Sequence, residues 1–249
     1  MAVVLVAAAI TWGLDVALTH RVNAGTDNAV RLSAVLTYVG IDGSYTLARA
    51  FGLTALVLSY LAVVMPLLPG RPLPASLHRQ TGIVTLALVA GHVFIPYSSS
   101  LPPYGGWRTG FVPWGQPVSW GIHAATWESF GIISFYLLIV TGPTYYLLGR
   151  RRAGWTILHR SAVLVYALSI VHAFLLGSDF LVAGPVRVIL LLAQVPVLGL
   201  LAYRLAPGAE PARRGLRWAG AATAAAGSAL VVGLGVLVAT GGYAAGMRI

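Results

Sequence analysis

The chain has 249 residues, of which 58% are hydrophobic and 9% charged, and its mean hydropathy is +0.83. A water-soluble core of this length needs fewer apolar residues, so the composition predicts a membrane protein. The net charge is +10, but all 16 basic residues are arginines near the ends of apolar segments, which favours the lipid bilayer and excludes a nucleic-acid partner. The absence of cysteine excludes disulfides, iron–sulfur clusters and thiol catalysis.

Apolar segments long enough to cross a bilayer follow one another along most of the chain. About 20 apolar residues in a helix span a hydrocarbon core of roughly 30 Å. We expect seven transmembrane helices, at residues 2–19, 46–68, 77–97, 126–148, 155–177, 184–204 and 218–240. No basic residue precedes the first segment, which favours a spanning helix over a cleaved signal peptide. The predicted fold class is all-α, a polytopic membrane helix bundle.

The connections between these helices carry arginine unevenly. If residues 69–79 are cytoplasmic, that side collects ten arginines and the other side six. This bias favours a multi-pass protein of the cell (cytoplasmic) membrane, with a cytoplasmic N-terminus and an external C-terminus. The connection at residues 96–121 is rich in Pro, Gly and Trp and is expected to lie at the membrane interface. No soluble domain remains, so any chemistry must use the bundle itself.

Four of the six histidines lie inside two of the predicted helices. His78 and His92 are on the third helix, and His159 and His172 are on the fifth. Ionisable residues at membrane depth are costly and usually face the bundle interior, so they are functional candidates. Because both helices run the same way, His78 should lie level with His159 near the cytoplasmic face. His92 should lie level with His172 near the external face, about 20 Å away.

Two imidazoles at one level leave a bare metal ion short of ligands, but haem needs only two axial ligands because the porphyrin supplies four. The pattern therefore predicts two haem b groups. His78 and His159 would ligate the inner haem iron, and His92 and His172 the outer. Such iron has no open coordination position, which suits electron transfer better than substrate activation.

Ideal helix geometry fits one helix better than the other. Fourteen residues at about 100° each bring His78 and His92 to within about 40° of the same face. Thirteen residues leave His159 and His172 about 140° apart. Helix tilt, a local irregularity, or a place for His159 in the first turn would each absorb this difference, and the sequence leaves the three open.

The spacing His-x13-His on the third helix with His-x12-His on the fifth, each opened by Leu-His-Arg, resembles the ferric reductase-like transmembrane domain. That superfamily includes ferric reductases, the membrane part of NADPH oxidases, and the haem subunit of the bacterial periplasmic methionine sulfoxide reductase. The resemblance covers residues 1–205 and implies a six-helix haem-binding core whose ligands are the four membrane histidines. Residues 206–217 would then be a cytoplasmic linker, and residues 218–249 would add a C-terminal transmembrane helix.

Many members of that superfamily carry a cytoplasmic FAD and NAD(P)H domain after the sixth helix. This chain has no Gly-rich dinucleotide fingerprint after a strand, so we expect no FAD or NAD(P) site in it. The electron donor would instead be a separate flavoprotein reductase or a membrane quinol.

Several other residues are candidates with two interpretations each. Arg79 and Arg160 directly follow the inner histidines and could pair with haem propionates, or could be snorkelling flanks of their helices. The same choice applies at the outer level to Arg49, Arg108 and Arg187.

Small and aromatic residues near the histidines also have two interpretations. Gly82 and Gly91 could admit a porphyrin or could only pack helices together. Tyr166 could lie between the haems or belong to the core. His20 and His123 could bind a metal substrate or could be ordinary external histidines.

The predicted function is transmembrane electron transfer from the cytoplasmic donor to an external acceptor, which could be ferric iron, oxygen or a partner reductase. The chain would be a ferric reductase-like oxidoreductase or the electron-transfer subunit of one. The alternative is a haem-free polytopic transporter or scaffold, whose histidines bridge helices or relay protons. Another quinol-linked four-histidine bundle would share the haems and differ in the donor.

Overall fold

The computed structural model describes residues 1–25, 27, 43–67, 74–98, 110–115, 121–144, 153–181 and 185–205, and these contain no strand. The helices are α1 (Ala2–Asn23), α3 (Gly43–Val64), the 3₁₀ helix η1 (Met65–Leu67), α4 (Ala75–Ser98), α6 (Gly121–Thr141), α8 (Ala153–Arg160), α9 (Ala162–Leu176), α10 (Ser178–Leu181) and α11 (Pro185–Leu205). The predicted all-α bundle is therefore confirmed. The predicted linker at 206–217 and the seventh helix at 218–240 lie outside the described residues.

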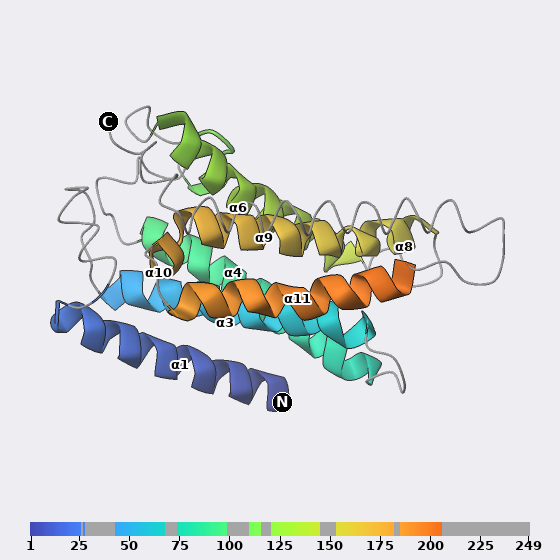
Figure 1. Cartoon of the computed structure of the whole chain (residues 1–249), viewed down its shortest axis with the longest axis horizontal. Helices are drawn as coiled ribbons and strands as arrows, with labels where there is room; N and C mark the ends of the chain where they lie inside the picture. The colour runs from blue at the N-terminus through green and yellow to red at the C-terminus, as the bar shows by residue number, and fades with distance from the viewer. Residues whose placement is uncertain are drawn as a thin grey trace.

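Helices α9 and α11 run along the long axis of the molecule, and α6 crosses that direction obliquely (Figure 1). The most extensive pairs are α3 with α4 and α6 with α9, and α3 also contacts α9 while α4 contacts α6. These four helices therefore form a ring of neighbours in which α4 and α9 stand diagonally opposite each other. Helix α1 packs on α3 and α4, and α11 packs on α3, outside this ring. Side chains of α4 and α9 that point inward can meet at the centre of the ring.

The outside of the bundle is apolar. Leu5, Trp12, Leu192 and Val195 each leave more than half of their surface exposed. Four helical stretches are long and apolar enough to cross a bilayer, namely Ala2–Asn23, Gly43–Leu67, Ile122–Thr141 and Leu158–Leu176. A surface of this kind is stable in lipid rather than in water. The chain is a multi-pass membrane protein.

Hydroxyl groups lie inside the bundle, where water-soluble proteins place mostly apolar side chains. Thr54 is fully buried, and its hydroxyl donates to Ala50 O at 2.8 Å while it accepts a bond of 3.0 Å from Thr11 of α1. Ser134 of α6 bonds Ser169 of α9 at 2.7 Å. Small hydroxyl residues let membrane helices approach closely and satisfy one another across the interface.

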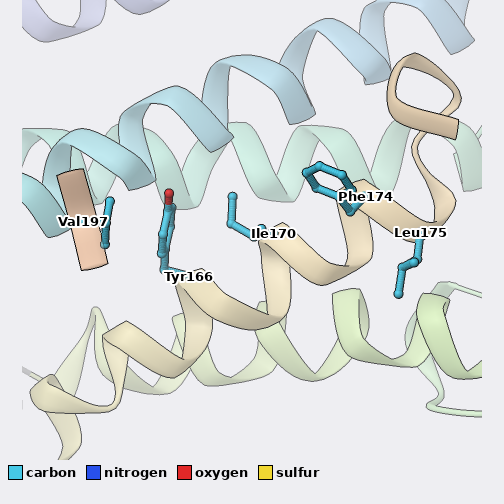
Figure 2. Packing of buried hydrophobic residues seen from close by; sticks show 5 residues of the cluster. All are labelled: Tyr166, Ile170, Phe174, Leu175 and Val197. Carbon is cyan, nitrogen blue, oxygen red and sulfur yellow. The ribbon is translucent and has the colours of Figure 1, made fainter. Parts of the chain in front are cut away.

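An apolar cluster joins α9 to its neighbours (Figure 2). It consists of Tyr166, Ile170, Phe174 and Leu175 of α9 with Val197 of α11, all at most 6% exposed. Tyr166, Ile170 and Phe174 recur every four residues, which is the spacing of one helix face, and Leu175 follows Phe174 directly. This packing fixes the rotation of α9 about its axis, and with it the direction of His172.

Candidate functional site

The structure brings the four membrane histidines together as two pairs. The ring centres of His78 and His159 are 5.8 Å apart with planes at 89°, and those of His92 and His172 are 6.5 Å apart at 76°. We call these the inner pair and the outer pair, after the levels expected from the sequence. Each pair joins α4 to the α8–α9 segment across the centre of the ring. Along α4 the levels are 14 residues apart, a rise of about 21 Å.

Main-chain carbonyls hold both rings of the outer pair. His92 Nδ1 lies 2.8 Å from Ala48 O on α3, and His172 Nδ1 lies 3.0 Å from Trp127 O on α6. A carbonyl oxygen can only accept, so each imidazole donates from Nδ1. The lone pair of each ring is then on Nε2, which is the nitrogen available to a metal.

A glycine lies against each ring of the outer pair. A Cβ added to Gly52 of α3 would lie 2.7 Å from His92 Nδ1, and one added to Gly131 of α6 would lie 2.7 Å from His172 Nδ1. Such distances are far inside van der Waals contact, so no larger residue fits without moving the ring. Sequence reasoning missed these two glycines, because each meets its histidine only through helix packing across about 40 residues of chain.

The inner pair is held differently. His159 stacks on Trp155 of the same helix, with ring centres 4.8 Å apart and planes at 12°. His78 Nδ1 is buried and has no hydrogen-bond partner within the described part of the chain. A buried polar atom of this kind is costly, and it marks a place where a polar partner or a bound group can be accommodated.

A break in the fifth predicted helix reduces the mismatch in its histidine spacing. The helix expected at 155–177 is divided at Ser161 into α8 and α9. Ser161 N donates to Leu158 O at 3.2 Å, three residues back, and its hydroxyl donates to the same oxygen at 2.6 Å. A three-residue turn winds more tightly than an α-helix by about 20° per residue, so this turn offsets about 60° of the roughly 140° difference. Of the three explanations left open by the sequence, the structure shows the local irregularity, and His159 lies in the last turn of α8.

The donor set and its spacing fit a haem better than a bare metal ion. A metal lies about 2 Å from an imidazole nitrogen, so two rings on opposite sides of one ion have centres roughly 6 to 6.5 Å apart. Both pairs are close to that separation. Within the described residues no cluster of three or more His, Cys, Asp or Glu could hold a metal ion, so a bare ion would lack ligands at either pair. A porphyrin would supply the remaining four.

The predicted arginine candidates differ in their surroundings. Arg79 and Arg160 both have exposed side chains beside the inner histidines. Arg49 is only 8% exposed and binds Asp27 through two bonds, Nη1 to Oδ1 at 2.9 Å and Nη2 to Oδ2 at 3.3 Å. Arg108 and the side chain of Arg187 lie outside the described residues.

Most of the remaining candidate residues have no contact that indicates a cofactor or metal site, and two of them serve helix packing. A Cβ on Gly91 would lie 3.1 Å from the ring of Phe51, so Gly91 packs α4 against α3, whereas a Cβ on Gly82 would meet nothing within 4 Å. Tyr166 is buried in the apolar cluster, and its hydroxyl donates to Gln194 Oε1 at 2.8 Å. His20 and His123 are exposed at the ends of α1 and α6, and neither belongs to a metal-binding group within the described residues.

Fold and site together define an all-α, multi-pass membrane bundle with two pairs of facing, partly buried histidines between its helices. Comparisons of the chain with protein-family models, with curated proteins and with solved structures found no match.

Proposed function

We propose that this protein transfers electrons across the cell membrane through two bis-histidine b-type haems. The observation that supports the proposal most strongly is the presence of two facing imidazole pairs at two depths of one bundle. The ferric reductase-like transmembrane domain is the family whose histidine pattern the chain resembles, and we propose membership of it for residues 1–205.

The residue roles follow from the site. His78 and His159 would hold an inner haem, and His92 and His172 an outer one. When bound, a haem with two imidazole ligands exchanges single electrons and has no position for a substrate. Ala48 O and Trp127 O hold the outer imidazoles in the tautomer that presents Nε2, and the apolar exterior of the bundle keeps the site in a water-poor environment. Arg79 and Arg160 are proposed partners for the inner propionates.

The proposed direction runs from the cytoplasm outward, with the N-terminus of the chain in the cytoplasm. The donor would be a separate flavoprotein reductase or a membrane quinol. The acceptor would be ferric iron, oxygen or an external partner reductase.

The alternative function is a haem-free transporter or scaffold, and one observation favours it. The hydrogen bonds of the outer histidines join α4 to α3 and α9 to α6, which is what a purely structural histidine would do. A purely structural role does not explain why the ring of His92 lies opposite that of His172, or why His78 and His159 form a similar pair at the inner level.

A reduced-minus-oxidised spectrum of the purified full chain, with a haem count, separates these functions. We expect a Soret band, an α band that sharpens on dithionite reduction, and two haems per chain. His92→Ala should remove the outer haem and leave the inner, and His78→Ala should do the reverse. A colourless protein would eliminate the electron-transfer function, and two haems in both variants would show that the ligands are wrong.

A further inference from the structure

The two glycines beside the outer pair occupy equivalent places on two helices. On α3, Gly52 comes four residues after Ala48, whose carbonyl accepts from His92. On α6, Gly131 comes four residues after Trp127, whose carbonyl accepts from His172. In an α-helix each carbonyl points toward the residue four positions later, so in both cases the glycine lies beside the accepting oxygen.

This arrangement lets one carbonyl take two hydrogen bonds. The first comes from the helix itself and the second from the imidazole, which uses the other lone pair of the oxygen. A methyl group at Gly52 would lie 2.7 Å from His92 Nδ1 and 2.9 Å from Cε1, and at Gly131 it would lie 2.7 and 2.8 Å from the same atoms of His172. The methyl would therefore collide with the nitrogen that makes the bond, and the ring would have to turn away.

The inner pair has no counterpart of this arrangement within the described residues. Neither His78 nor His159 donates to a main-chain carbonyl there, and His78 Nδ1 is buried without a partner. The recess formed by a carbonyl and a glycine is thus a property of the outer level, where it occurs on both sides.

We infer that Gly52 and Gly131 are positioning residues that set both the ligating nitrogen and the reduction potential of the outer haem. The inference rests on the proposed function. Donation from Nδ1 to a carbonyl makes the imidazole a stronger electron donor through Nε2. A stronger donor stabilises oxidised iron, so these two hydrogen bonds lower the reduction potential at the outer level.

The test uses Gly52→Ala and Gly131→Ala in the full chain, purified in detergent, with haem content and midpoint potentials from a spectroelectrochemical titration. We expect each variant to lose outer haem, and the outer haem that remains to titrate at a higher potential than in the wild type. The inner component should keep its content and potential, which also shows that the bundle is folded. His92→Ala, which retains only the inner haem, identifies the two components.

Two control substitutions separate positioning from a general effect of replacing a helical glycine. Gly13→Ala on α1 and Gly199→Ala on α11 each add a methyl that meets nothing within 4 Å. Both should leave the outer potential unchanged. The inference fails if Gly52→Ala and Gly131→Ala keep wild-type haem content and potentials, or if either control shifts the outer component equally. A wild type without haem would overturn the proposed function, and this inference with it.

Discussion

Asp27 and Arg49 bring opposite charges into the interior near the start of α3. Asp27 is fully buried and receives both terminal nitrogens of Arg49, and Arg21 Nε lies 3.9 Å from the same carboxylate. The guanidinium of Arg49 also lies 5.5 Å from the centre of the Tyr45 ring. A charge at this depth is tolerated when a partner compensates it. Arg49, a candidate partner for an outer haem propionate in the sequence analysis, is thus already paired with the carboxylate of Asp27.

Removing one partner of this ion pair should destabilise the protein more than removing both partners. Arg49→Met removes both hydrogen bonds that Arg49 donates to Asp27 and leaves a buried carboxylate without that positive charge. We expect the free energy of unfolding to fall by about 3 to 5 kcal/mol. The double variant Asp27→Leu/Arg49→Met removes both charges and should lose much less. Thermal unfolding in detergent, followed by tryptophan fluorescence, compares the two variants.

The haem content of the double variant is a second measurement. It should equal that of the wild type if the role of Arg49 is to neutralise Asp27. Equal stability of the single and double variants would refute the ion-pair account, and selective loss of the outer haem from a stable double variant would return Arg49 to the haem site.

At the scale of helices, the sequence predicted positions well and local breaks poorly. The bilayer sets the length of an apolar segment, so the expected helices at 77–97 and 184–204 match α4 and α11 to within two residues. The sequence allowed a local irregularity in the fifth helix but did not place it at Ser161, because no Pro or Gly marks that position and the apolar pattern continues through it. The pairing of the histidines followed from helix direction, whereas the carbonyls and glycines that orient the outer rings depend on contacts between distant helices.

A one-residue insertion tests the role of the break. An alanine inserted between Ser161 and Ala162 should turn α8 by about 100° relative to α9 and move it by about 1.5 Å. His159 would then leave the inner pair, while His172 stays fixed by its bond to Trp127 O and by the apolar cluster. We expect loss of the inner haem with the outer haem retained, measured by haem count and spectrum.

A matched insertion provides the control. An alanine placed after Gly177, in the interruption between α9 and α10, lies beyond His172 and should leave both haems bound. If the insertion at Ser161 left the inner haem intact, the segment would be adaptable and the break would not set the direction of His159.

At the scale of the whole molecule, the two histidine levels give the bundle two chemically different ends. The inner pair lies toward the end where α4 begins, and the outer pair toward the end where α6 begins. Electron transfer in a defined direction across a membrane depends on which end faces the cytoplasm. The arginine bias of the connections favours a cytoplasmic inner end, so a measured orientation of the bundle tests the proposed direction of transfer.

The absence of cysteine makes that orientation directly measurable. Ser76 near the start of α4 and His123 near the start of α6 are both exposed and lie at opposite ends of the bundle, so Ser76→Cys and His123→Cys each introduce a single thiol without burying it. In intact cells, a membrane-impermeant maleimide should label His123→Cys, and it should label Ser76→Cys only after permeabilisation. The unmodified chain, which cannot react, gives the background. The reverse labelling pattern would place His78 and His159 at the external face, and the proposed direction of electron transfer would then have to be inverted while the pairing of the histidines stands.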